Sequence, residues 1–231
     1  ASSLADEIAA ACSPIGPFEA VFVDDGSDDA TPETLAALRA AHPWLRSVRH
    51  VESCGQSAAV ATGVRAARAA LICTIDGDGQ NPPTEIPKLV APLLAPDRPA
   101  RLRRDRRDVA ARRWASRAAN AIRARLLHDG SPDTGCGLKA FPRDAFLALP
   151  YFDHMHRYLP SLFLREGWEI AHVDVNHRAR ETGRTKYTNI GRALVGALDL
   201  FGVWWLMRRR KRPVIAKEPA SAGPALGKAA E

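Results

Sequence analysis

Apolar residues along this chain fall into two patterns, short continuous runs and longer segments with apolar positions every three or four residues. The short runs end in Asp, Gly or Ser and are typical of buried strands, whereas the longer segments are typical of helices that cover a sheet. Their alternation predicts an α/β domain built on a parallel sheet. The predicted strands are 18–23, 45–51 and 70–76, and the predicted helices are 31–42, 55–69 and 83–94.

The pattern changes after residue 95. Residues 96–113 are polar and rich in arginine, so no strand is predicted there, and a basic helix is predicted from about Val109 to His128. A turn-rich stretch and a short apolar segment, "LKAF", come next, followed by a helix over 156–167 and an alternating strand over 168–178. The first twelve residues read as the body of a helix without an initial methionine, so we expect a trimmed start. Thr31 is predicted to cap the helix that follows the first strand.

The last long apolar run, Ala193 to Met207, contains one charged residue, Asp199. Its fifteen residues are fewer than the ~20 that span a bilayer. Trp204 and Trp205 precede five basic residues, an arrangement that suits the headgroup region of a membrane surface. We therefore expect an interfacial helix, followed by a disordered tail from about Pro213.

Composition indicates a globular protein, because 46% of the 231 residues are hydrophobic. The four cysteines lie far apart and form no C-x-x-C pair, which disfavours a zinc site or a disulfide framework and favours a reducing, cytosolic setting.

Charge is distributed unevenly along the chain. Residues 101–128 carry +8 and residues 208–231 carry +5, so the rest carries −6 within a total of +7. Two basic blocks on an acidic domain indicate anionic partners at defined places, such as phosphates or an anionic lipid surface. Nucleic acid is disfavoured, because the blocks lack interleaved aromatic residues and no nucleic-acid-binding signature is present.

Two acidic turns follow predicted strands, "VDDGS" with Asp24 and Asp25, and "IDGDGQ" with Asp76 and Asp78. Carboxyl ends of parallel strands lie at one edge of a sheet, so we expect the two turns to meet. Carboxylates at this position need a cationic partner, and Asp76, Asp78 and Gln80 are spaced to converge on Mg²⁺ or Mn²⁺. The alternative is that the aspartates only cap a turn and the next helix.

Three stretches in this order, "VDDGSDDAT", "IDGDGQNPP" and "RETGRTKYTN", resemble the family-2 glycosyltransferases over about residues 4–207. The resemblance is to the dolichol-phosphate mannosyltransferase or polyprenyl-phosphate sugar transferase type. It implies a GT-A fold, a Rossmann-like mixed sheet flanked by helices. We expect a transferase domain over 1–187, an amphipathic membrane-interface helix over 188–212 and the tail over 213–231.

The resemblance implies a donor site at the ends of the strands. Asp76, Asp78 and Gln80 would hold Mg²⁺ or Mn²⁺ and the nucleotide diphosphate. Asp24 and Asp25 would lie at the nucleoside, although "VDDGS" also reads as a plain turn. The first turn of the helix at Gly55 and Gln56 offers free amides for an anion, although its small residues also suit tight packing.

The resemblance places the acceptor phosphate among basic residues. Arg184 and Lys186, in a loop around Gly183, would close over phosphates, the alternative being a solvated basic loop. "DTGCG" could equally be a tight turn, and His154 and His156 have an unspecific spacing and receive no role. By resemblance the acceptor residues are Arg117, Asp133, Gly137 and Arg180, and the catalytic residues are Asp78, Arg117, Arg184 and Lys186.

The expected activity is metal-dependent, inverting transfer of a sugar from a nucleotide-diphosphate sugar, GDP-mannose-like or UDP-linked, to polyprenyl or dolichyl phosphate. The enzyme would act peripherally at the cytoplasmic face of the membrane. A phosphate acceptor is already mostly ionised at neutral pH, so no general base is needed. The family's first strand and a strand between Leu94 and Arg113 are missing here, which favours the alternative of a non-catalytic or truncated remnant that binds nucleotide or membrane without turnover.

Overall fold

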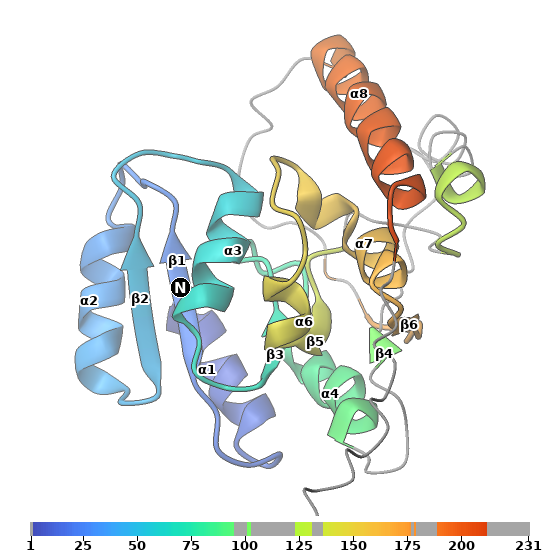
Figure 1. Ribbon diagram of the computed structural model, residues 1–231. Coiled ribbons are helices and arrows are strands. Elements are labelled where there is room, and N and C mark those ends of the chain that lie inside the picture. Colours follow the sequence, from blue (N-terminus) through green and yellow to red (C-terminus); the bar gives the residue numbers. More distant parts are fainter. Residues whose placement is uncertain are drawn as a thin grey trace, which may run out of the picture.

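The computed structural model describes residues 2–94, 101–102, 123–130, 136–176, 178 and 189–211 (Figure 1). The helices are α1 (Ser2–Cys12), α2 (Thr31–Ala41), α3 (Gln56–Ala66), α4 (Ile86–Leu94), α6 (Arg143–Leu147), α7 (Leu159–Arg165) and α8 (Asn189–Arg208), with 3₁₀ turns at Pro83–Glu85 and Met155–Arg157. The strands are β1 (Ala20–Asp24), β2 (Leu45–Arg49), β3 (Leu71–Thr74), β4 (Arg101–Leu102), β5 (Lys139–Pro142) and β6 (Glu169–Ile170).

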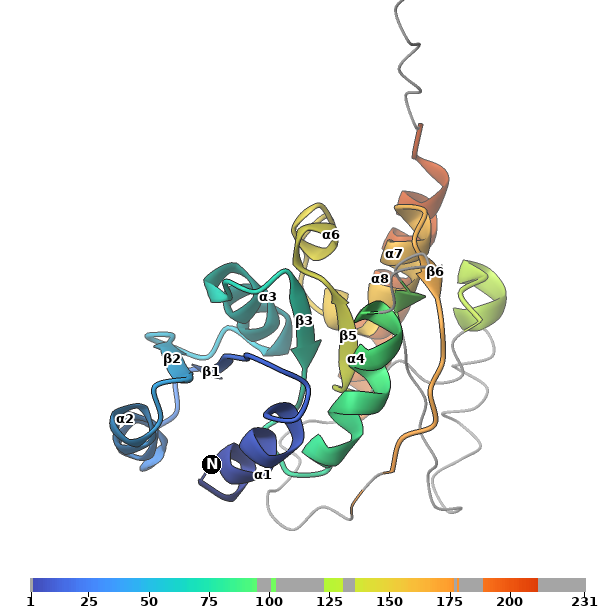
Figure 2. The same ribbon diagram turned by 90° about the horizontal axis from the view of Figure 1, so that it is seen from below.

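The strands form one layer between two layers of helices. Figure 2 shows β2, β1, β3 and β5 side by side, with α3 and α6 on one side and α1 and α4 on the other. β1 and β2 are parallel, with Asp24 opposite Arg49. β3 and β5 are antiparallel, with Thr74 opposite Lys139. The α/β class is therefore confirmed, with both parallel and antiparallel strand pairs among the described residues.

β1 and β3 are not paired with each other in the described chain, and an apolar cavity of about 640 Å³ lies between them. Its lining comes from both strands and from α1, α3 and α4, and includes Phe22, Val60 and Ile72. Each strand thus has one hydrogen-bonded edge and one edge facing the cavity. The expectation that the family's first strand is missing stays a prediction.

Two expectations for the later strands were wrong. Arg101 and Leu102 form the two-residue strand β4, inside the stretch for which no strand was predicted. The strand predicted over 168–178 is reduced to Glu169 and Ile170, which pair in parallel with β4. An alternating pattern becomes a strand only where it can pair with the edge of a neighbouring strand. β4 offers an edge of only two residues, so β6 is equally short.

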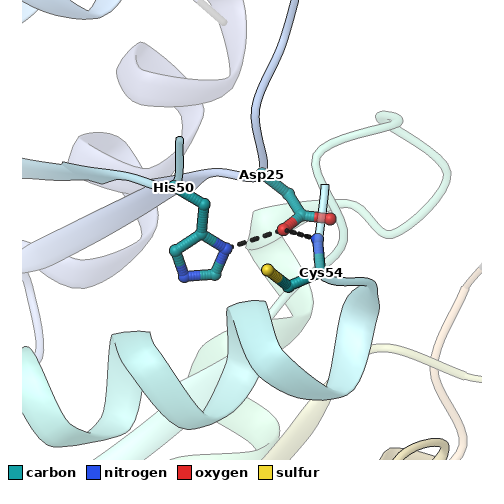
Figure 3. A group of neighbouring side chains, drawn as sticks. All are labelled: Asp25, His50 and Cys54. Atoms are coloured by element: carbon teal, nitrogen blue, oxygen red, sulfur yellow. Dashed lines mark hydrogen bonds and ion pairs between the residues drawn. The ribbon is translucent and has the colours of Figure 1, made fainter. Parts of the chain in front are cut away.

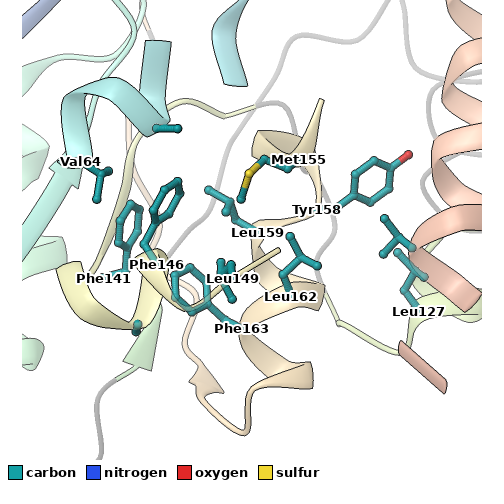
Figure 4. Close-up of a cluster of buried hydrophobic side chains, with 13 residues drawn as sticks. Val64, Leu127, Phe141, Phe146, Leu149, Met155, Tyr158, Leu159, Leu162 and Phe163 are labelled. Atoms are coloured by element: carbon teal, nitrogen blue, oxygen red, sulfur yellow. The ribbon is translucent and has the colours of Figure 1, made fainter. Parts of the chain in front are cut away.

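The largest hydrophobic core joins α3, β5, α6, α7 and α8 (Figure 4). Phe141, Phe163, Met155, Leu162 and Val203 are each at most 2% exposed, so this core is close to dry. Its aromatic centre is the contact of Phe141 with Phe146 and Phe163, whose ring centroids lie 5.3 and 5.4 Å away. The core fixes α8 on the domain.

α8 has one buried and one exposed apolar face. Val203 is buried and Trp204 packs against the core, whereas Leu198 and Phe201 are more than 60% exposed. At its end, the Arg208 guanidinium lies over the Trp204 ring at 4.1 Å. Within the described ranges, no helix is both long enough and apolar enough to cross a bilayer. The tail beyond Lys211 lies outside the described residues.

Candidate functional site

The two acidic turns meet at the amino-terminal end of α3, as the sequence predicts. Gly55 donates its main-chain N–H to Asp25 Oδ2 at 2.8 Å, and Gln56 donates from Nε2 to Asp76 Oδ1 at 2.8 Å. Gly55 and Gln56 are adjacent at the start of α3. They therefore bind Asp25 of the first acidic turn and Asp76 of the second. The arrangement places "VDDGS" and "IDGDGQ" on either side of α3.

Asp25 is held by the loop that leads into α3 (Figure 3). Its carboxylate accepts hydrogen bonds from the N–H groups of Cys54 and Gly55, from Ser53 Oγ, and from His50 Nδ1 at 2.7 Å. Burial raises the pKa of Asp25, but these bonds outweigh it and hold the pKa at about 2. The Gly55 amide is thus not free for an anion, because the Asp25 carboxylate already occupies that position.

Asp24 sits deeper than Asp25. Its Oδ1 accepts the Ser27 N–H at 2.9 Å, and its Oδ2 lies 3.3 Å from Arg49 Nε. Gly26 turns the chain between Asp24 and Ser27 with a φ of 73°, and a Cβ on Gly26 would collide with the Glu52 main chain. The turn therefore requires glycine at this position. A contact of Asp24 or Asp25 with a nucleoside stays a prediction.

Asp25, His50 and Cys54 bring three metal-ligand atoms within 4.8 Å of one another. The donor set does not suit a resident metal, because the Asp25 oxygens already accept four hydrogen bonds. His50 is engaged on both ring nitrogens, Nδ1 by Asp25 and Nε2 by Thr62 Oγ1 at 2.9 Å. The cluster fastens the loop before α3.

Asp76 follows β3 and lies against Gly137, which precedes β5. The antiparallel pairing of Thr74 with Lys139 sets this opposition, and Thr74 Oγ1 donates to the Gly137 carbonyl at 2.7 Å. A Cβ built on Gly137 would overlap the Asp76 carboxylate, so only glycine leaves that carboxylate in place. Gly137 therefore supports the second acidic turn from the opposite strand.

Asp78 lies two residues further along the same turn. Its Oδ1 accepts the Gln80 N–H at 3.1 Å, and Gly79 permits the bend with a φ of 75°. A small pocket of about 170 Å³ adjoins this turn and includes Glu7 and Arg178 in its wall. Carboxylates of Asp76 and Asp78 are hard oxygen donors on one turn, where both residues are half-buried, which fits Mg²⁺ or Mn²⁺. The part of Gln80 as a ligand stays a prediction.

Several residues from the sequence prediction cannot be placed. Arg117 belongs to the basic part of the sequence after β4, Asp133 to the sequence before β5, and Arg180, Arg184 and Lys186 to the sequence before α8. Their assignment to the phosphates remains a prediction. Outside the described residues lie Arg117, Asp133, Arg180, Arg184 and Lys186.

Four residues near this site had no assigned role, namely Ser57, Lys139, His154 and His156. Ser57, the second residue of α3, is 2.7 Å from His156 Nδ1 through its Oγ. His154 pairs instead with α8, its Nδ1 lying 3.0 Å from Asp199 Oδ2. Lys139 is buried at the start of β5 and donates to the Cys136 carbonyl. The lysine inside the short apolar segment "LKAF" is the signal that sequence inspection could have used.

The model of the family described as "Glycosyl transferase family 2" matches residues 2–149. Among curated proteins, the dodecaprenyl-phosphate galacturonate synthase of Rhizobium johnstonii is 34% identical over 202 residues, covering 85% of this chain and 60% of that protein. The undecaprenyl-phosphate 4-deoxy-4-formamido-L-arabinose transferase of Pseudomonas savastanoi is 38% identical over 179 residues, covering 74% and 51%. The chain thus spans about half to three fifths of these relatives.

Solved structures show the same fold. A mannosyltransferase from Pyrobaculum calidifontis, in complex with GDP-Man and Mn²⁺, has a TM-score of 0.62 at 20% identity, covering 92% of this chain and 63% of that chain. Glucosyl-3-phosphoglycerate synthase from Mycobacterium tuberculosis, with Mn²⁺, UDP-glucose and phosphoglyceric acid, has a TM-score of 0.62 at 18% identity, covering 87% and 74%. The fold is GT-A, and the chain belongs to glycosyl transferase family 2.

Proposed function

We propose that this chain is the transferase unit of an enzyme that moves a sugar from a nucleotide-diphosphate sugar to polyprenyl or dolichyl phosphate, with inversion, at the membrane surface. The observation that carries the proposal is the hydrogen bond from Gln56 to Asp76, with Gly137 against the same carboxylate. These contacts hold Asp76, a residue of the proposed donor site, between the end of β3 and the start of α3. The named activities of the two curated relatives support the lipid phosphate as acceptor.

A divalent cation suits the second acidic turn. Asp76 and Asp78, with Gln80, are the residues that would hold Mg²⁺ or Mn²⁺. When bound, the cation would supply positive charge that offsets the leaving nucleotide diphosphate. Mn²⁺ in the related solved structures supports this choice of ion without deciding between the two.

The chain's own residues position the reactants and neutralise charge. Gln56 donates to the Asp76 carboxylate and Gly137 leaves room for it, and this carboxylate is proposed to belong to the donor site. Attack comes from an oxygen of the lipid phosphate, which is already deprotonated, so no side chain has to take a proton. The bond from the anomeric carbon to the diphosphate breaks as the new bond forms on the opposite face. Arg117, Asp133, Arg180, Arg184 and Lys186 are proposed at the phosphates from the sequence alone.

Membrane contact is proposed for the exposed face of α8. Leu198 and Phe201 are exposed by 65% and 62%, and Val195 and Trp205 extend the same face. Arg209 lies over the Trp205 ring at 5.4 Å, which places positive charge beside an apolar surface. Such a face suits peripheral binding to an anionic membrane, here the cytoplasmic leaflet. Residues 1–187 then form the transferase domain and 188–212 the interfacial segment.

The second candidate is a chain that binds nucleotide or membrane without turnover. The cavity of about 640 Å³ between β1 and β3 favours it, because the layer that carries both acidic turns is interrupted there.

The test is incubation of the chain with bacterial membranes and a panel of radiolabelled nucleotide sugars. We expect the native chain to convert label into a form that is extractable into organic solvent. The Asp78→Asn variant should produce no such label. Binding of nucleotide without extractable label for any sugar would favour the second candidate. Absence of both would contradict the proposal.

A further inference from the structure

His156 is fixed to the start of α3 by two contacts to one hydroxyl. Its main-chain N–H donates to Ser57 Oγ at 3.2 Å, and the same oxygen lies 2.7 Å from its ring Nδ1. Ser57 is only 4% exposed, so this hydroxyl is shielded from water. The imidazole is therefore held in one orientation by a buried partner.

These contacts favour one tautomer of the ring, in which Ser57 accepts one hydrogen bond and donates one. The Ser57 oxygen already accepts the His156 main-chain N–H, so its own hydrogen is available for Nδ1. With Nδ1 as an acceptor, the neutral ring has its hydrogen on Nε2. In the described part of the chain, no hydrogen-bond partner occupies Nε2, which leaves a donor available to a ligand.

The surroundings of the ring are positive. Burial lowers the pKa of His156 to about 3, and the charges of Lys139, Arg157 and His154 act in the same direction. At neutral pH the ring is consequently uncharged and donates without gaining a proton. A neutral donor among cationic groups is suited to an anion.

The ring also lies close to the donor-side turn. Ser57 is the neighbour of Gln56, which binds Asp76, and Lys139 is paired with Thr74 two residues before Asp76. Thus α3 presents Gln56 to the acidic turn and Ser57 to His156. The loop around Met155 thereby reaches the same helix start from the other half of the domain.

We propose that His156 binds a phosphate group of a substrate through its Nε2–H, with Ser57 as the positioning residue and Lys139 adding positive charge. The inference rests on the proposed function for the identity of the phosphate, which belongs either to the nucleotide-diphosphate sugar or to the lipid phosphate. Binding by Nε2–H itself requires only a phosphate. His156 is a phosphate-binding residue in this scheme and transfers no proton.

Two substitutions separate ligand binding from a structural role. His156→Asn places an amide oxygen near the position of Nδ1, so it keeps the Ser57 contact but removes the donor at Nε2. His156→Gln places an amide N–H₂ near the position of Nε2 and keeps that donor. Urea unfolding of both variants and the native chain shows whether the fold is retained, because a structural role alone predicts that Asn is tolerated at least as well as Gln.

The first measurement is nitrogen-15 NMR of the histidine rings in the native chain, with inorganic pyrophosphate as the probe. We expect the Nε2–H tautomer for His156 and a shift of its Nε2 signal on pyrophosphate addition that is absent in His156→Asn. The Nδ1–H tautomer, or a signal indifferent to pyrophosphate, would overturn the inference. This result does not depend on sugar transfer, so it is distinct from failure of the proposed function.

The second measurement identifies the phosphate. Affinity is determined separately for a nucleoside diphosphate and for a short polyprenyl phosphate. We expect His156→Asn to weaken one of them about tenfold or more, as a lost hydrogen bond to a charged group does, and His156→Gln to retain most of it. Equal affinities for the native chain and both variants would contradict the inference even if sugar transfer is observed.

Discussion

Gln56 at the start of α3 donates from Nε2 to Asp76 Oδ1 after β3, at 2.8 Å across twenty residues of sequence. The bond orients a carboxylate that two further constraints also hold, the end of the strand and the close approach of Gly137. One oxygen of Asp76 thereby accepts a hydrogen bond from a side-chain amide. Carboxylate oxygens are the hard donors that a divalent cation prefers.

Gly137→Ala tests the close approach to Asp76. The added methyl group would occupy the place of the carboxylate and force Asp76 to move. We expect affinity for a nucleoside diphosphate with Mn²⁺ to fall about tenfold or more, with a loss of stability of about 1–3 kcal/mol from overpacking. Calorimetric titration and urea unfolding measure the two effects. Gly202→Ala on α8 is the control, since a Cβ there meets nothing within 4 Å, and equal binding by both variants would refute the constraint.

Asp25→Asn tests the anchor of the loop before α3. Folding lowers the pKa of Asp25 from 3.8 to about 2, so its stabilisation is present above pH 3.8 and is lost as the pH falls toward 2. We expect the variant to lose about 1 kcal/mol at neutral pH, a figure reduced for solvent access, and to show a flatter decline in acid. Unfolding by urea at a series of pH values measures this.

The matched control for this anchor is Asp28→Asn, because Asp28 is exposed in the same turn. It should keep both the neutral stability and the acid decline of the native chain. An equal effect of the two substitutions would mean that net charge, and not the hydrogen bonds to Asp25, determines the pH dependence.

The exposed face of α8 is tested by Leu198→Ser combined with Phe201→Ser. Removing two large apolar side chains that are 65% and 62% exposed should reduce binding to anionic vesicles severalfold, with little change in stability. Co-sedimentation with phosphatidylglycerol vesicles gives the measurement. Leu147→Ser, an exposed leucine on α6, should bind as the native chain does. Unchanged sedimentation of the double variant would exclude this face as the membrane contact.

The strands of the first half were predictable because their apolar runs end in acidic or turn residues. β3 falls inside the predicted range 70–76, and β1 overlaps the predicted range 18–23 but ends one residue later, at Asp24. The cap of α2 was less predictable. Thr31 was expected as the cap, but the helix begins at Thr31, whose N–H donates to Asp29 Oδ1 at 2.9 Å. Either a side-chain carboxylate or a hydroxyl can accept a hydrogen bond from the N–H groups at a helix start. The sequence pattern alone does not choose between them.

The site was predictable in position but not in its pairings. The acidic turns meet as expected, although β1 and β3 are not paired with each other in the described chain and the start of α3 contacts both turns. That Gly55 would bind Asp25, and Ser57 would bind His156, depends on contacts 30 and 99 residues apart in sequence. No local periodicity encodes such contacts. The free amide expected at Gly55 was wrong for this reason, and His156 received no role.

The measurement that tests the account most directly is calorimetric titration of a nucleoside diphosphate with Mn²⁺, with and without EDTA, on the native chain and on Asp78→Asn. If Asp76 and Asp78 hold a cation that the nucleotide shares, native binding is lost with EDTA and lost in the variant. The variant should keep or exceed the native thermal stability, because two neighbouring carboxylates repel each other when no cation is present. Nucleotide binding that is indifferent to EDTA, or an Asp78→Asn chain that binds as the native chain does, would contradict the donor site proposed at the end of β3.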